Sequence, residues 1–326
     1  MKRLAIMFLA AASCVWAQAP ASTGPTLGFV PGVRPWQLQP ILGIPGAARL
    51  GDPISLPRSV SQLYLAPGQA YAVAAQGPTD AVSLVILRSA GATVVNPALT
   101  TIAGAMAAPD LVAFSPAGQS MALYSQEASR IQVFTGMPNA PQKSEEISVV
   151  GNAALLAVSD DAKAVLICDG MGNVYSLAQN AAPVPMYHTE EVVALVFIPQ
   201  THDIIVVDPM GESSAVVQAL NGIQMIPTPA NACQPRAATT TADGKTILLA
   251  CTSQRLVWSI DRASGSIAVH SVNSNPTGFS SLNLPDTFVM SPVDGNGTYW
   301  LFTWQAGNPM VSFIGAARLA TQRIFQ

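Results

Sequence analysis

Six stretches of this 326-residue chain share one layout, in which an apolar run reaches a turn and a second apolar run follows. The stretches cover residues 63–75, 112–125, 156–169, 195–208, 238–251 and 282–291. With the turn residues Ala66, Ser115, Ser159, Ile198, Thr241 and Leu284 as anchors, the successive spacings are 49, 44, 39, 43 and 43 residues. A period of about 40 to 45 residues indicates one supersecondary unit stacked against copies of itself.

The clearest unit covers residues 237–272 and contains four strand-like runs. The runs are 238–241, 246–251, 256–261 and 267–272, and the dipeptide Asp243-Gly244 between the first two is a hairpin signal. Four short antiparallel strands joined by tight turns form one blade of a β-propeller. Since no window shows a sustained helical period, we predict an all-β propeller. The alternatives are a β-sandwich or two smaller β domains.

The segment TADGKTILLACTSQRLVWSIDRASG, residues 241–265, resembles the bacterial YVTN-type repeats of WD40-like propellers. Their pattern is Ser/Thr-Pro-Asp-Gly-Lys, an apolar strand, and a second apolar strand that ends in Ile-Asp before a Gly turn. Ala242 stands in place of the proline, and Leu-Leu-Ala-Cys at 248–251 replaces the hallmark tetrapeptide. The resemblance is best over 238–272 and holds only in outline elsewhere. It implies a propeller fold and says little about function.

The two ends of the chain carry partial units that predict how the ring closes. Strand-like runs at 26–30 and 36–44 precede the first hairpin, and only one strand's length, about 317–325, follows the last full blade. The pentapeptide Gly-Ala-Ala-Arg-Leu occurs at 46–50 and again at 315–319, each time after an apolar run. A propeller hides its edges by pairing strands from both termini in one blade. We therefore predict seven blades with a shared closing blade, and six blades as the alternative.

The N-terminus has the features of a secretory signal peptide over residues 1–17. Lys2 and Arg3 precede a short apolar run, and cleavage is expected before Gln18. A lipoprotein signal ending at Cys14 is the less favoured alternative. No later run reaches about 18 apolar residues, so no transmembrane segment is expected in the mature chain. We predict one propeller domain over 18–326, located in the periplasm or outside the cell.

The composition limits the partners. Only 10% of the residues are charged and the formal net charge is −3, which argues against binding to nucleic acid. With 50% hydrophobic residues, the chain has enough apolar surface to bury a core.

Three cysteines remain after the predicted cleavage. Cys233 and Cys251 flank the hairpin at Asp243-Gly244 but lie three residues out of register for that turn. Because an exported protein meets oxidising conditions, we predict a Cys233–Cys251 disulfide. Cys168 is left over, and we expect it to be a buried thiol.

The motifs that would carry chemistry are weak, and we predict no catalytic, cofactor or metal site. His188, His202 and His270 lack partners at ligand spacing. The Gly-rich stretches 169–173 and 294–298 resemble the start of a calcium loop but lack its distal Glu, so both are expected to be turns.

Acidic pairs occur at 145–146, 160–161 and 190–191. Neighbouring residues of a strand point to opposite faces, so these pairs are expected to be solvated charges rather than facing carboxylates. The partial nucleophile motif at 118–122 lies inside a predicted hairpin, where a nucleophile elbow is not found.

These observations predict an exported, monomeric, non-enzymatic binding or scaffold protein with a protein or cell-surface partner. Its contact surface is expected on the loop face around the central channel, with Trp36, Tyr187, Trp300 and Trp304 as aromatic candidates. The first alternative is a hydrolase like the propeller lactonases, which have repeats of the YVTN type. The second is an outer-membrane β-barrel, against which an aromatic content of only 6% argues.

Overall fold

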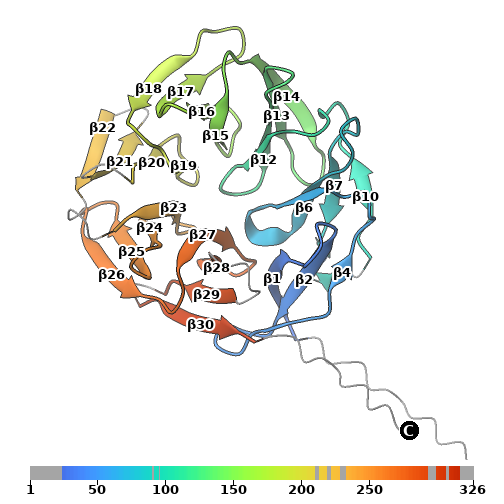
Figure 1. Ribbon diagram of the computed structural model, residues 1–326, viewed down its shortest axis with the longest axis vertical. Helices are drawn as coiled ribbons and strands as arrows, with labels where there is room; N and C mark the ends of the chain where they lie inside the picture. The colour runs from blue at the N-terminus through green and yellow to red at the C-terminus, as the bar shows by residue number, and fades with distance from the viewer. Residues whose placement is uncertain are drawn as a thin grey trace, which may run out of the picture.

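The strands form seven four-stranded antiparallel sheets around one axis, as Figure 1 shows. This computed structural model describes residues 24–315 except 90–91, 95, 210–212, 219–221, 228–232, 293–298 and 306–307. The predicted all-β propeller is confirmed. The expected signal peptide 1–17, Cys14 and the expected strand 317–325 lie outside the described residues.

In six of the sheets, successive hairpins run from the channel outward. The second sheet contains β5 (Gln62–Leu65), β6 (Tyr71–Ala75), β7 (Ser83–Ile86) and β10 (Leu99–Thr101), and the short pair β8 (Arg88–Ser89) and β9 (Ala92–Thr93) lies beside it. The third contains β11 (Leu111–Phe114), β12 (Ser120–Ser125), β13 (Arg130–Thr135) and β14 (Gln142–Ser148). The fourth contains β15 (Ala153–Val158), β16 (Val165–Asp169), β17 (Asn173–Leu177) and β18 (Val184–His188).

The remaining three regular sheets follow the same order. The fifth contains β19 (Ala194–Phe197), β20 (Ile204–Val207), β21 (Ser213–Gln218) and β22 (Gly222–Pro227). The sixth contains β23 (Pro235–Thr240), β24 (Thr246–Cys251), β25 (Leu256–Asp261) and β26 (Ile267–Ser271). The seventh contains β27 (Pro276–Ser281), β28 (Thr287–Pro292), β29 (Tyr299–Thr303) and β30 (Met310–Ile314). The unit predicted at 237–272 is therefore one complete blade.

A separate apolar cluster fills the space between each sheet and the next. Tyr71 and Phe134 belong to the cluster between the second and third sheets, and Phe288 and Val257 to the one between the sixth and seventh. Two further clusters place the first sheet between the seventh and the second, with Ile41 in one and Phe29 in the other. Burial of these faces is the main stabilising contribution, and it makes the first sheet a blade of the ring.

The turn anchors that define the repeat are buried at the channel end of each blade. In five blades the anchor N–H donates to the carbonyl five residues later, as from Ser115 to Ser120 at 3.0 Å. In the last blade this bond runs from Leu282 to Thr287, so the anchor Leu284 was wrong by two residues. The residue three after Leu282 is Pro285, which has no N–H to close the turn, and the turn extends instead.

The first sheet is assembled differently from the others. It contains β1 (Thr26–Pro31), β2 (Gln37–Leu42), β3 (Arg49–Leu50) and β4 (Ile54–Ser55), with β3 and β4 both paired to β2. The two predicted N-terminal strands are confirmed. The described outer strands of this sheet, β3 and β4, come from residues 49–55, and the C-terminal strand expected at about 317–325 lies outside the described residues. The two ends meet at a parallel bridge between Arg49 and Gly315.

The edge of β1 that faces the axis is covered by other groups. A 3-10 turn, η1 (Pro67–Gln69), places the buried side chain of Gln69 so that it accepts a hydrogen bond from the Phe29 N–H. The Asn283 N–H donates to the Leu27 carbonyl at 3.0 Å, and the Tyr299 hydroxyl donates to the Pro31 carbonyl at 3.2 Å. These contacts satisfy an edge that would otherwise be free to pair with another chain. No helix among the described residues has the length and apolar character needed to cross a membrane.

Candidate binding site

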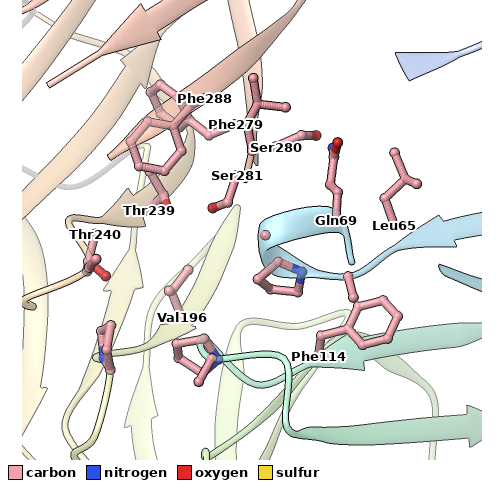
Figure 2. A pocket seen from close by; sticks show the side chains of 18 of the residues that line it. Leu65, Gln69, Phe114, Val196, Thr239, Thr240, Phe279, Ser280, Ser281 and Phe288 are labelled. Atoms are coloured by element: carbon pink, nitrogen blue, oxygen red, sulfur yellow. The ribbon is translucent and has the colours of Figure 1, made fainter. Parts of the chain in front are cut away.

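The inner strands of six blades surround a cavity of about 550 Å³ on the propeller axis. These strands are β5, β11, β15, β19, β23 and β27, and Figure 2 shows the side chains that line the space between them. Six rim turns bound its mouth, at residues 66–69, 115–118, 159–162, 198–201, 241–244 and 282–287. A cavity of this size is in the range of small-molecule sites.

One wall of the cavity is apolar. It is contributed by β11, β15 and β19, through residues such as Phe114, Leu156 and Val196. The inner strands of these blades contain almost only apolar residues, for example Leu-Val-Ala-Phe in β11 and Ala-Leu-Val-Phe in β19. This wall would bury an apolar surface of a ligand.

The other wall carries hydroxyl groups beside the rings of Phe279 and Phe288. Thr239 and Thr240 come from β23, and Ser280 and Ser281 come from the adjacent β27. Figure 2 shows them across the cavity from Phe114. Thr-Thr and Ser-Ser end these two inner strands directly before the rim turns, where other blades have apolar residues. The sequence contained this signal, but our prediction did not use it.

Asp286 is the one ionisable residue among the described residues that line the cavity. It lies in a rim turn, and its Oδ1 accepts a hydrogen bond from the Ala242 N–H at 2.6 Å. In three other rim turns a proline follows the anchor, namely Pro67, Pro116 and Pro199. The part of the mouth that lines the cavity is therefore mostly uncharged, and its described carboxylate, Asp286, already accepts a hydrogen bond.

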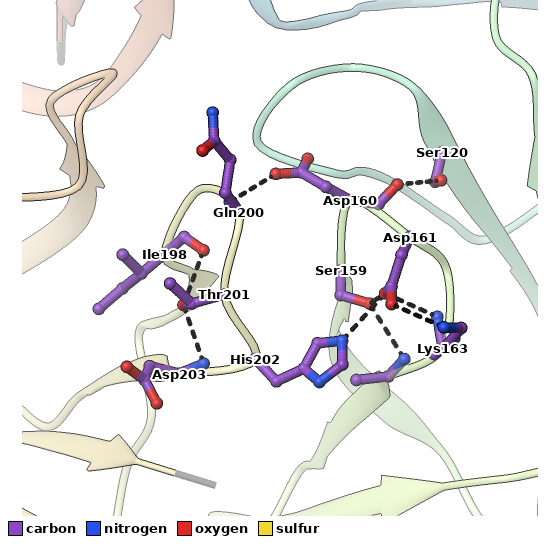
Figure 3. Close-up of polar contacts among 11 residues, drawn as sticks. Ser120, Ser159, Asp160, Asp161, Lys163, Ile198, Gln200, Thr201, His202 and Asp203 are labelled. Atoms are coloured by element: carbon purple, nitrogen blue, oxygen red, sulfur yellow. Dashed lines mark hydrogen bonds and ion pairs between the residues drawn. The ribbon is translucent and has the colours of Figure 1, made fainter. Parts of the chain in front are cut away.

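Asp160 joins three neighbouring rim turns, as Figure 3 shows. Its carboxylate accepts the Gln200 N–H at 2.9 Å on one side and the Ala117 N–H at 2.7 Å on the other. Its backbone carbonyl accepts the Ser120 hydroxyl at 2.8 Å. A carboxylate that bridges blades in this way fixes the shape of the mouth.

Asp161 contacts His202 of the next blade at 3.0 Å and also accepts the Ser159 hydroxyl at 2.8 Å (Figure 3). Partial burial acts to raise the pKa of Asp161, but these hydrogen bonds and the histidine hold it below its usual value. The pair 160–161 and His202 are thus structural contacts at the rim. They are not carboxylates that face each other across the cavity.

The remaining acidic and histidine candidates lie away from the cavity. Glu146 pairs with Arg130 and Lys143 on an outer strand, while Glu191 lies 3.6 Å from Arg236. His270 contacts the Ser259 hydroxyl at 2.8 Å. Burial lowers the pKa of His270. His188, at the end of β18, is exposed.

The two predicted Gly-rich turns have different outcomes. In 169–173, Asp169 accepts the N–H groups of Met171 and Asn173, both at 2.9 Å, which is turn geometry as expected. The stretch 294–298 lies outside the described residues. The described residues contain no group of three or more His, Cys, Asp or Glu side chains that would hold a metal ion.

Cys233 and Cys251 form a disulfide with a Cα–Cα distance of 5.2 Å, as predicted. The three-residue register gap is reduced by a bulge in β23, where the pairing with β24 shifts between Pro235 and Ala237. Cys168 is a buried free thiol. Its burial raises its pKa to about 11.

The four aromatic candidates do not line the cavity. Trp36 packs beneath Arg34, Trp300 contacts Phe313, and Trp304 contacts His270. Tyr187 packs against the cluster between the fourth and fifth sheets. The residues that line the cavity belong instead to the inner strands and rim turns, and their aromatic members are phenylalanines such as Phe114 and Phe279.

A second cavity, of about 370 Å³, lies where the first blade has no inner strand. It is lined by residues of β1, β2 and β5, and it shares Leu65 and Ser280 with the central cavity. Among the described residues, the propeller therefore has seven four-stranded sheets and six inner strands around its axis.

The fold and the cavity define a β-propeller with an axial site. No protein-family model and no curated protein sequence matches this chain. Many solved structures are similar in fold, including the following three. A catalytically inactive virginiamycin B lyase from Staphylococcus aureus with quinupristin has a TM-score of 0.52 and 12% identity, over 86% of this chain and 91% of that one.

A functionally unknown protein from Desulfotomaculum acetoxidans has a TM-score of 0.59 and 12% identity, over 90% of this chain and all of that one. Hydrazine synthase from Kuenenia stuttgartiensis has a TM-score of 0.52 and 11% identity, over 92% of this chain and 98% of that one. At such identities the similarity shows the fold alone. The resemblance to YVTN-type repeats stays a prediction.

Proposed function

We propose that this protein is an exported, monomeric, non-enzymatic binding protein with one propeller domain. Its ligand lies in the central cavity, and its rim turns are the surface for a protein or cell-surface partner. One observation carries the proposal, namely that apolar and hydroxyl side chains line the cavity together with a single, already bonded carboxylate, Asp286. Such a lining can bind a ligand by burying its apolar surface and by forming hydrogen bonds between uncharged groups.

Export to the periplasm or the cell exterior is supported by the Cys233–Cys251 disulfide, since such bonds persist in oxidising compartments. The signal-peptide pattern of residues 1–17 agrees with it. The fold neighbours include two proteins named as enzymes and one of unknown function, so the fold itself does not decide between binding and catalysis.

The test is retention of a ligand from an extract of exporting cells. The native protein is incubated with the extract and re-isolated, and the bound small molecules are identified by mass spectrometry. A channel variant, Val196→Arg, is expected to lose them. A matched outer-surface variant, Val269→Arg, is expected to keep them, because Val269 is an exposed residue of the outer strand β26. Equal retention by native protein and Val196→Arg would contradict the proposal.

The hydrolase alternative predicts a different experimental result. An acyl-transfer enzyme that used this cavity would depend on Asp286, the one carboxylate in its lining. Lactone hydrolysis by the native protein that Asp286→Asn abolished would replace the binding function with a catalytic one.

A further inference from the structure

We infer that the central cavity recognises an uncharged molecule with an apolar face and with hydroxyl or carbonyl oxygens along its opposite edge. This inference rests on the proposed function, because it names the ligand class of the same cavity. The two walls of the cavity differ in chemistry, and each matches one side of such a molecule. The walls are formed by different blades, so the asymmetry is built into the ring.

The hydroxyl wall has unused hydrogen-bonding capacity. The side chains of Thr239, Thr240, Ser280 and Ser281 make no hydrogen bond to any other described residue. None of the four is among the buried polar atoms without a partner in the described part of the chain, and all four residues line the cavity. A hydroxyl donates one hydrogen bond and accepts others, so this wall suits either an alcohol or a carbonyl.

Hydroxyl residues end two neighbouring inner strands. Thr239 and Thr240 are consecutive in β23, and Ser280 and Ser281 are consecutive in β27, the inner strand of the next blade. Figure 2 shows the two pairs on neighbouring sides of the cavity. A ligand that lies flat against Phe114 would thus present its opposite edge to hydroxyl residues of both strands.

The charges of the residues that line the cavity also limit which ligands it can bind. An ionised ligand that entered between the walls would lose hydration, and no cationic residue is among the described residues of the lining. Asp286 lies at the rim rather than between the walls, and Ala242 already donates to it. An uncharged ligand avoids this cost.

The test uses four probes of nearly equal size, with binding followed by fluorescence anisotropy. They are 1-pyrenemethanol, 1-methylpyrene, 1-pyrenecarboxylate and 1-pyrenemethylammonium. We expect the alcohol to bind roughly 3- to 10-fold more tightly than methylpyrene, which is the effect of one neutral hydrogen bond. The two charged probes are expected to bind at least about tenfold more weakly than the alcohol.

Substitutions in the hydroxyl wall test whether its hydroxyl groups cause the tighter binding of the alcohol. In the double variant Thr240→Val with Ser281→Ala, the alcohol should lose its advantage while methylpyrene binds as before. Ser253→Ala, at an exposed turn on the other end of the sixth blade, is the matched control and should change nothing. Thermal unfolding of each variant checks that it is folded.

The outcomes separate the inference from the function on which it rests. If no probe binds the native protein better than the Val196→Arg variant, the proposed function fails and the inference fails with it. If the probes bind in the channel but a charged probe binds as tightly as the alcohol, only the inference is overturned. The inference is also overturned if 1-pyrenemethanol still binds more tightly than 1-methylpyrene in the double variant.

Discussion

Arg49 and Gly315 form a parallel bridge that joins the first sheet to the last. The Leu50 N–H donates to the Gly315 carbonyl at 2.9 Å, and the Gly315 N–H donates to the Ala48 carbonyl at 3.2 Å. The first copy of the repeated pentapeptide, at 46–50, thus meets the first residue of the second copy, and residues 316–319 lie outside the described part of the chain. The closure joins segments more than 260 residues apart in sequence. The Gly46 N–H also donates a hydrogen bond to the Ser312 hydroxyl, across a separation of 266 residues.

A proline at position 315 should weaken this closure. Gly315→Pro removes the N–H that bonds to Ala48 and should lower the free energy of unfolding by about 1 to 3 kcal/mol. Gly315→Ala is the control, because the nearest atom to an added Cβ is the Ala48 carbonyl oxygen at 3.9 Å. Urea unfolding measures both. Equal stability of the two variants would mean that this hydrogen bond does not hold the ring.

The contact between Gly28 and Gln69 predicts that substitutions at these two positions have non-additive effects on stability. A Cβ on Gly28 would lie within 2.4 Å of Gln69 Oε1 and 2.5 Å of Leu282 Cδ2, so Gly28→Ala should cost about 1 to 3 kcal/mol. Because Gln69→Ala removes one of the clashing groups, the double variant should cost less than the sum of the single variants.

The control for that cycle is Gly170→Ala, whose added Cβ meets no atom within 4 Å. It should change stability by no more than about 0.5 kcal/mol. Strict additivity of Gly28→Ala and Gln69→Ala in urea unfolding would show that the two residues do not share a packing contact.

The cysteines predict a definite pattern of thiol reactivity. In a chain beginning at Gln18, the native protein should show no rapidly reacting thiol, because Cys168 is buried and its pKa is raised to about 11. Unfolding should expose one thiol, and reduction should expose three. The variant Cys233→Ala with Cys251→Ala should lose about 2 to 4 kcal/mol of stability. Three reactive thiols in the unreduced, unfolded protein would contradict the disulfide.

His270 predicts a loss of stability toward acid. Burial lowers its pKa in the folded state, so below about pH 6.5 the unfolded chain binds a proton more readily than the folded one. The free energy of unfolding should therefore fall as the pH drops from about 6.5, and this contribution should be constant above it. His270→Gln should flatten the slope between pH 8 and 5.5, whereas His188→Gln, at an exposed position, should keep it.

The regular blades could be predicted from sequence because each hairpin carries its own turn signal. The runs 246–251 and 256–261 match β24 and β25 residue for residue. The first blade could not be predicted in full, because β3 and β4 have two residues each and no alternation to detect. Their position depends on pairing with β2, which is a tertiary contact.

The site was harder to predict, because the polarity of a channel depends on which strands face one another across it. A search for acidic, histidine and aromatic residues found groups that the fold uses elsewhere, such as Asp160 in the rim and Trp304 against His270. The hydroxyl pairs of β23 and β27 become significant only when the ring places them across the cavity from β11.

The most direct test of the central claim is a crystal structure of the protein with 1-pyrenemethanol. We predict electron density for the probe in the axial cavity, with its rings against Phe114 or Val196. Its hydroxyl should lie within hydrogen-bonding distance of Thr240 or Ser281. Density only outside the cavity, or a probe in the cavity with its hydroxyl turned toward the apolar wall, would contradict the account.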